Sequence, residues 1–172
     1  MNQAERRVWL IKALLDERPD GRSIAVPAGA SEQRDLLRAL MNVRPPEALA
    51  AETLEIQDTY LQQRLLERGG ATDASTLPYR DRVAIWRGDI TLLKTDAIVN
   101  AANSQMLGCF VPGHSCIDNA IHTYAGMQLR LACANLMDEQ GHEEPTARVK
   151  VTPAFNLPSS YVFHTVGPVV PS

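Results

Sequence analysis

The chain has 172 residues, of which 45% are hydrophobic and 22% are charged, with a formal net charge of -3 and a pI near 5.8. This length allows one hydrophobic core with a small accessory subdomain, and the charge balance excludes a broadly basic surface for duplex nucleic acid. No apolar run reaches the roughly 20 residues of a membrane span, and the charged N-terminus does not resemble a signal peptide. We therefore expect a cytoplasmic protein with neither nucleic-acid nor membrane partners.

Three amphipathic helices are expected in the first 70 residues. Residues 4–17 place four apolar side chains on one face of a helix. A second helix begins near the candidate N-cap Ser31 and stops before Pro45-Pro46, and a third follows those prolines and ends at Gly69-Gly70. These apolar faces carry no catalytic pattern, so we interpret 1–70 as a helical subdomain that packs against the following domain. Recognition of a partner or substrate is the alternative.

The remainder of the chain alternates strands with a helix. Residues 71–81 are polar and contain proline, which indicates a linker. Strands are expected at 83–87, 97–100, 149–154 and 161–166, and one long helix from Cys116 or Ile117 to about Met137. This alternation indicates an α/β domain over 82–172.

Polar residues gather directly after the strand expected at Ala97–Asn100. Asn100 and Asn103 bracket two alanines, and a loop with two glycines, two cysteines and a histidine precedes the next helix. A strand, a loop and a helix N-terminus in this order suit a phosphorylated ligand, because backbone amides and the helix dipole face the anion. Asparagine often caps a strand end, but the small alanines between these two would let a ligand approach the backbone.

Cys109, His114 and Cys116 form a candidate metal site within that loop. A C-x4-H-x-C spacing can bring two thiolates and an imidazole to one Zn²⁺, since the glycines around and within the run let the backbone fold tightly. Three protein ligands are typical of an open site rather than a closed structural one. The spacing fits no standard zinc finger, so two half-buried cysteines beside a surface histidine remain the alternative. Cys133 is interpreted as a core residue in the helix.

Four motifs resemble, in order and spacing, those of the macrodomain family of ADP-ribose-binding modules. They are Gly88-Asp89-Ile90-Thr91, Asn100-Ala-Ala-Asn103, Asp118-Asn-Ala-Ile-His122 and Phe163-His-Thr-Val-Gly-Pro168. Most macrodomains carry a run of glycines where this chain has Gly108–Cys116, and that replacement resembles the zinc-containing branch, whose members hydrolyse protein-linked ADP-ribose. The resemblance implies a three-layer α/β/α fold with a mixed sheet, preceded by the helical extension of that branch.

The resemblance also implies the ligand-binding residues. Asp89 would accept a hydrogen bond from the adenine amino group, with the Ile90 amide close by, and Asn100 belongs to the same ligand site. Asn103 would touch the distal ribose. The alternative for Asp89, from its residues alone, is an exposed turn aspartate.

The catalytic residues implied are Asn103 and Asp118, and one zinc ion would be bound by Cys109, His114 and Cys116. Asp118 would orient or deprotonate the attacking group, although a carboxylate in the first turn of a helix is also favoured by the helix dipole. His122 and His164 are interpreted as structural residues.

The function implied is zinc-dependent removal of O-linked mono-ADP-ribose from protein side chains by a monomeric enzyme. Its partners would be ADP-ribose and a mono-ADP-ribosylated protein. A reader that binds ADP-ribose without hydrolysis and a zinc-stabilised interaction module are the alternatives.

The C-terminus departs from the pattern of the family. Macrodomains continue past the His164–Pro168 motif into a second phosphate loop and central strands, whereas this sequence stops at Ser172. We therefore expect a truncated domain in which the inner edges of strands 83–87 and 97–100 are unpaired. Half of the diphosphate cradle would be missing, so hydrolysis would be weak or absent.

Overall fold

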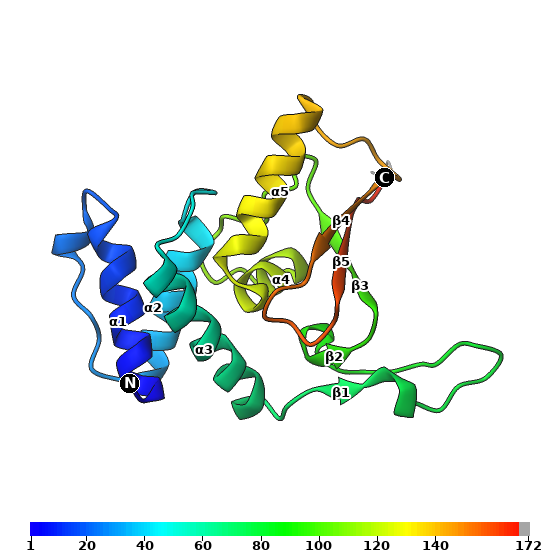
Figure 1. The fold of residues 1–172 in the computed structure, drawn as a ribbon, viewed down its shortest axis with the longest axis horizontal. Helices are drawn as coiled ribbons and strands as arrows, with labels where there is room; N and C mark the ends of the chain where they lie inside the picture. Colours follow the sequence, from blue (N-terminus) through cyan, green and yellow to red (C-terminus); the bar gives the residue numbers. More distant parts are fainter. Residues whose placement is uncertain (169–172) are drawn as a thin grey trace.

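The computed structural model describes residues 1–168 and begins with three helices (Figure 1). These are α1 (Gln3–Asp16), α2 (Ala30–Val43) and α3 (Ala51–Glu67), with a short 3-10 helix, η1 (Gly21–Ser23), after the first. Leucine and isoleucine side chains from all three pack into one buried cluster. The three helices expected from apolar periodicity are therefore present, and their grouping as a subdomain over 1–70 stays a prediction, since Met127 of the later chain belongs to the same buried cluster. The last four residues of the domain expected at 82–172 lie outside the described part.

The ends of these helices follow different capping chemistry. The Asn2 side chain accepts a hydrogen bond from the Glu5 amide at 3.0 Å, and the Glu5 carboxylate accepts one from the Asn2 amide at 2.8 Å, which forms a capping box at α1. The cap expected at Ser31 is wrong, because Gly29 is the N-cap residue of α2 and Ser31 lies within its first turn.

A three-stranded mixed sheet forms the second half of the molecule. Its order is β3 (Ala97–Ala102), β5 (Tyr161–Val166) and β4 (Val149–Pro153), with β3 parallel and β4 antiparallel to β5. Helices α4 (Ile117–Ala125) and α5 (Met127–Gln140) cover one face of it (Figure 1). The side chains of Ile98 and Val162 are buried in the core between sheet and helices. The expected strands at 97–100, 149–154 and 161–166 are confirmed, and the first is two residues longer.

The single helix expected from Cys116 or Ile117 to Met137 is instead two helices. Gly126 separates them with a φ of +101°, a value that residues with a side chain rarely adopt. A Cβ atom at this position would lie 2.5 Å from Gln128 Oε1 and 2.8 Å from Gln57 Nε2. Gly126 therefore lets the chain turn where α3 approaches the start of α5.

The strand expected at 83–87 is absent. Val83 forms only an isolated bridge with Arg80, and the side chains of Val83 and Ile85 are 65% and 92% exposed. This segment projects from the molecule without a neighbouring strand (Figure 1), so its alternating apolar residues have no partner for a hydrogen-bonded ladder. The expected linker instead contains β1 (Thr72–Asp73), which pairs with β2 (Leu93–Lys94), and the 3-10 helix η2 (Ala74–Thr76).

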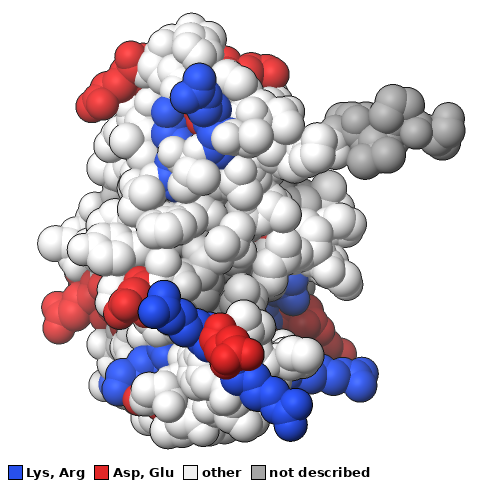
Figure 2. Space-filling view, turned by 90° about the vertical axis from the view of Figure 1, so that its right-hand side faces the viewer, with Lys and Arg blue, Asp and Glu red and all other residues white. Residues whose placement is uncertain are grey.

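The face of the sheet opposite α4 and α5 is bare within residues 1–168. Figure 2 shows a broad band without charged side chains on this side of the molecule, and the following apolar side chains are at least 37% exposed there: Val99, Val149, Val151, Tyr161 and Phe163. Strand β3 has a partner on one edge only in the described part of the chain. The open edge expected for this strand is therefore present. Among the described residues no helix has both the length and the hydropathy to cross a membrane.

Candidate active site

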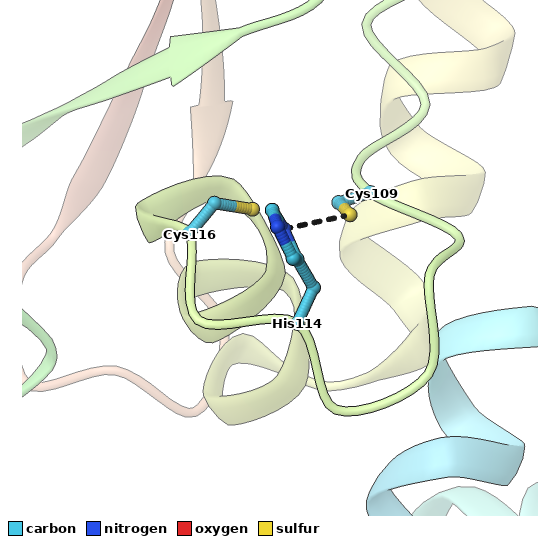
Figure 3. A group of neighbouring side chains, drawn as sticks. All are labelled: Cys109, His114 and Cys116. Atoms are coloured by element: carbon cyan, nitrogen blue, oxygen red, sulfur yellow. Dashed lines mark hydrogen bonds between the residues drawn. The ribbon is translucent and has the colours of Figure 1, made fainter.

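The three expected metal ligands converge in the loop between β3 and α4. The Sγ atoms of Cys109 and Cys116 and a ring nitrogen of His114 all lie within 4.8 Å of one another (Figure 3). Cys109 Sγ is 3.6 Å from His114 Nδ1. Both cysteines are half-buried and the histidine is exposed, so the cluster opens towards solvent on one side.

The donor atoms of this cluster fit one zinc ion. Two thiolates and an imidazole are the ligand types that zinc prefers, and three protein ligands leave a fourth position for a ligand or water. Burial raises the pKa of Cys116, and the nearby Cys109 thiol and Asp118 charge raise it further, although the Asn119 amide opposes the shift. The raised pKa favours the neutral thiol of Cys116. A bound zinc ion would favour the thiolate instead, because a cysteine ligand must be deprotonated.

Asn119 is a residue of this site that the sequence interpretation missed. It is fully buried, and its amide N–H donates to Cys116 Sγ at 3.3 Å, which makes Cys116 the N-cap residue of α4. Its side-chain nitrogen donates to the carbonyl oxygens of Val111 at 3.0 Å and Cys109 at 3.4 Å. The sequence could have pointed to Asn119 because it lies inside the Asp118–His122 motif. A buried asparagine at the start of a helix needs hydrogen-bond partners for both its amide oxygen and its amide nitrogen.

Asp118 lies in the first turn of α4 and faces the interior. Its Oδ1 atom accepts a hydrogen bond from Asn100 Nδ2 at 2.8 Å and lies 3.5 Å from His122 Nε2. Burial raises the pKa of Asp118, while the hydrogen bond from Asn100 and the charge of Arg130 act in the opposite direction. The structure therefore places a carboxylate with increased proton affinity two residues from Cys116.

Asn100 is fully buried beneath this carboxylate. Because Asn100 and His164 are register partners on β3 and β5, Asn100 Nδ2 also lies 3.1 Å from His164 Nδ1. An amide nitrogen only donates, so Nδ1 accepts and the imidazole proton sits on Nε2, 3.0 Å from Thr152 Oγ1. In this structure the Asn100 side chain orients Asp118, and its contact with a ligand stays a prediction.

The buried histidines predict a loss of stability in mild acid. Burial lowers the pKa of His122 to about 3, with Arg130 and His164 contributing, and burial lowers that of His164 to about 4, against an ordinary value of 6.5. Below pH 6.5 the unfolded chain therefore binds protons that the folded protein excludes, and stability falls as the pH falls. At pH 5 each histidine is expected to cost roughly 2 kcal/mol.

Urea unfolding at pH 7 and pH 5 measures this effect. His164→Asn is expected to lower stability at both values but to show a pH difference smaller than wild type by roughly 2 kcal/mol. An equal pH difference in wild type and variant would contradict the assignment of His164 as a neutral core residue.

Asp89 and Ile90 lie at the start of the 3-10 helix η3 (Ile90–Leu92). Asp89 Oδ1 accepts hydrogen bonds from the Thr91 amide at 2.9 Å and its hydroxyl at 2.7 Å, while Oδ2 accepts one from Arg68 at 2.5 Å. Burial alone would raise the pKa of Asp89, but these hydrogen bonds and the Arg68 charge lower it overall. The Arg68 guanidinium also lies over the Tyr124 ring, 3.5 Å from its centre. Asp89 is therefore a fixed, ionised acceptor.

Asn103 is exposed just before the loop that carries Cys109, His114 and Cys116, which we call the metal-ligand loop. Its side-chain nitrogen donates to the Gly108 carbonyl oxygen at 3.1 Å. Gly108 has a φ of +78°, and a Cβ atom there would lie 2.8 Å from the His122 ring. The close approach of Gly108 to α4 therefore brings the start of the loop beside Asn103, and the contact of Asn103 with the distal ribose stays a prediction.

Comparison with known proteins places these features in a family. Residues 99–172 match the Macro domain family model. The chain is 55% identical over 174 residues to a Treponema medium protein named "Protein-ADP-ribose hydrolase", with 99% of this chain and 67% of that protein covered. A Staphylococcus aureus protein of the same name is 44% identical over 167 residues, with 96% and 62% covered. The chain thus spans about two thirds of the length of these relatives.

Solved structures support the same assignment. A Trypanosoma brucei macrodomain is 30% identical with a TM-score of 0.52, and the similarity covers 77% of this chain and 57% of that one. The same macrodomain in complex with ADP-ribose is 29% identical with a TM-score of 0.50, and 76% and 59% are covered. The family model, the relatives and the mixed sheet agree, and the chain therefore belongs to the macrodomain family.

Proposed function

We propose that this chain carries the active site of a zinc-dependent hydrolase that removes O-linked mono-ADP-ribose from protein side chains. The observation that carries the proposal is the convergence of Cys109, His114 and Cys116 at the N-terminus of α4, next to Asp118. Two relatives named protein-ADP-ribose hydrolase, at 55% and 44% identity, support the reaction class.

The substrate is a glycoside at C1 of the distal ribose, and its cleavage proceeds through an oxocarbenium-like transition state. Asp118 is held through Oδ1 by Asn100, which leaves Oδ2 to orient the attacking water or accept its proton. Asn103 would bind the distal ribose. A bound zinc ion would supply Lewis-acid stabilisation of a ribose hydroxyl or of the scissile linkage.

The proposed arrangement differs from that of a two-carboxylate glycosidase. Such enzymes use a pair of Asp or Glu residues on either side of the scissile bond. In the described part of the chain, the groups close to Asp118 Oδ1 are the Asn100 amide and the His122 imidazole. We propose instead one carboxylate, Asp118, beside the metal site.

Asp89→Ala is expected to weaken ADP-ribose binding by about 1–3 kcal/mol, the contribution of one charged hydrogen bond, which corresponds to a Kd increase of about 5- to 150-fold. The loss would arise at the adenine end, where the resemblance to macrodomains places Asp89, and Arg68 and Thr91 hold its carboxylate in place for that contact. Titration calorimetry with ADP-ribose measures it. Asp96→Ala, an exposed aspartate nearby in sequence, is the matched control, and equal affinities for both variants and wild type would remove Asp89 from the ligand site.

A reader of ADP-ribosylation is the second candidate, supported by the Trypanosoma brucei macrodomain solved with ADP-ribose. A reader binds ADP-ribose but releases none from a modified protein. Incubating a mono-ADP-ribosylated protein with the chain, with and without a zinc chelator, separates the two candidates. Release that the chelator stops supports the hydrolase, and tight binding with no release, even when the chain is joined to the part of the Treponema medium relative that lies outside the match, supports the reader.

We further propose that full activity requires additional polypeptide that completes the sheet. The free edge of β3 and the apolar face that carries Val99, Val151 and Phe163 are the features that support this, because exposed strand edges and large apolar patches are normally covered. A third of the Treponema medium relative lies outside the match. Hydrolysis by the 172 residues alone is expected to be weak.

A further inference from the structure

Two side chains of α2 hold the metal-ligand loop from outside its own domain. Arg38 Nη2 donates to the His114 carbonyl oxygen at 2.9 Å, and Asn42 Oδ1 accepts a hydrogen bond from the Gly113 amide at 3.0 Å. The ribbon of α2 passes beside the loop in Figure 3. The helical subdomain therefore contacts the backbone of one metal ligand and of the glycine next to it.

Arg38 also fixes the orientation of Asn119. Arg38 Nη2 and Nε donate to Asn119 Oδ1 at 2.7 and 3.2 Å. With the amide oxygen turned towards Arg38, the amide nitrogen of Asn119 must point the other way, towards the carbonyl oxygens of Cys109 and Val111. Arg38 thus acts on both ends of the loop, directly at His114 and through Asn119 at Cys109.

The middle of this loop has little else to hold it. Val111 is 57% exposed and belongs to neither buried apolar cluster, and Gly113 has a φ of +65° with no atom within 4 Å of the position that a Cβ atom would take. Arg130 binds the first part of the loop, through the Leu107 carbonyl oxygen at 2.7 Å and the Phe110 ring. From Val111 to His114 a backbone hydrogen bond of 3.2 Å, from the His114 amide to the Val111 carbonyl oxygen, closes a turn, and the side chains that hold this turn in place are those of Asn119, Arg38 and Asn42.

We infer that Arg38 and Asn42 are positioning residues of the zinc site, so that the N-terminal helical subdomain sets the geometry of its metal ligands. This inference rests on the proposed zinc site. Groups that orient metal ligands typically change metal affinity by 10- to 100-fold when they are removed. The interpretation of α2 as packing alone makes the opposite prediction, since a helix that only packs can lose Arg38 without effect on metal affinity.

Arg38→Ala and Asn42→Ala are each expected to weaken zinc binding by about 10- to 100-fold. Competition with a chromophoric chelator measures the affinity, and the absorption bands of the Co²⁺-substituted protein report whether the ligand geometry changes. Arg34→Ala is the control on the same helix, because Arg34 forms no hydrogen bond with the loop in the described part of the chain. Thr123→Val is the control for Asn42, since it removes the Asn42–Thr123 hydrogen bond of 3.0 Å and the bond of 2.7 Å from the Thr123 hydroxyl to the Asn119 carbonyl oxygen, but keeps the bond from the Gly113 amide to Asn42.

Hydrogen exchange on the metal-free proteins shows whether the effect is local. Peptides that cover residues 107–116 should exchange faster in Arg38→Ala and Asn42→Ala than in wild type, while peptides from β5 and α5 should not change. A variant that exchanges faster throughout has lost its fold, and Arg38→Lys, which can still donate to one of the two acceptors, should then recover part of the zinc affinity.

The outcomes are distinguishable. If wild type binds zinc and both α2 variants match it in affinity and in Co²⁺ spectrum, the inference is wrong and the proposed function stands. If wild type binds no zinc at all, the proposed zinc-dependent function is wrong and this inference falls with it. Weakened binding in the two variants and wild-type binding in both controls would support it.

Discussion

Cys109→Ser and Cys116→Ser are each expected to remove about one equivalent of zinc from the purified protein, whereas Cys133→Ser is expected to retain it. The first two substitutions each delete one of three ligands, and two remaining donors in a half-exposed loop bind zinc weakly. Cys133 belongs to a different environment, because burial raises the pKa of its thiol to about 12 and its Sγ lies 3.8 Å from His164.

Elemental analysis after zinc supplementation and buffer exchange measures this effect. The three serine variants are matched in chemistry, so a difference between them reports position alone. Equal zinc content in all three, or a wild type that stays metal-free after supplementation, would contradict the assigned ligands.

Asp118→Ala and Asn103→Ala are expected to lower turnover far more than they lower affinity for ADP-ribose. For Asp118 the loss of turnover should reach about 100- to 10,000-fold, the usual contribution of a group that transfers or orients a proton in the transition state. The substitution leaves Asn100 bound to His164, so the buried network loses one member and keeps the rest.

Single-turnover release from a modified protein, together with titration of ADP-ribose, separates the two effects. Asp89→Ala is the comparison, since its expected loss is in affinity. If the Asp118, Asn103 and Asp89 variants all lose only affinity and by similar factors, the protein is better described as a reader.

The spacing of apolar residues correctly predicted the helices and strands that bury one face in a hydrophobic core. The three N-terminal helices and the strands Ala97–Ala102 and Tyr161–Val166 match the expected residues within a few positions, because apolar side chains at helical or alternating spacing record which face is buried. The break at Gly126 was missed for the same reason. Its flanking residues keep a helical apolar pattern, and only the positive φ and the approach of α3 reveal the turn.

The expected strand at Val83–Arg87 shows where periodicity is insufficient. Alternation of Val83 and Ile85 with charged residues is a genuine strand pattern, but a strand also needs a neighbour to complete its hydrogen bonds. Within residues 1–168 only Arg80 pairs with this segment. The expected strand is therefore wrong for this structure, because the alternating pattern has no neighbouring strand to pair with in residues 1–168.

The site was predictable to the extent that it is local in sequence. Cys109, His114 and Cys116 lie within eight consecutive residues, so their spacing alone suggested a candidate metal site, with two half-buried cysteines beside a surface histidine as the alternative. The residues that orient the metal ligands and Asp89 are distant from them in the sequence. Arg38 precedes His114 by 76 positions, and Arg68 precedes Asp89 by 21, and no spacing rule connects an arginine on a separate helix to a carbonyl or carboxylate in a loop.

Zinc-dependent release of ADP-ribose from a mono-ADP-ribosylated protein tests the central claim most directly. We would measure it for the 172-residue chain alone and for the same chain joined to the portion of the Treponema medium relative that lies outside the match. The proposal predicts weak release by the chain alone and clear release by the joined protein, abolished by a chelator and restored by zinc. Release that the chelator leaves unchanged, or none from the joined protein while the relative itself is active in the same assay, would contradict it.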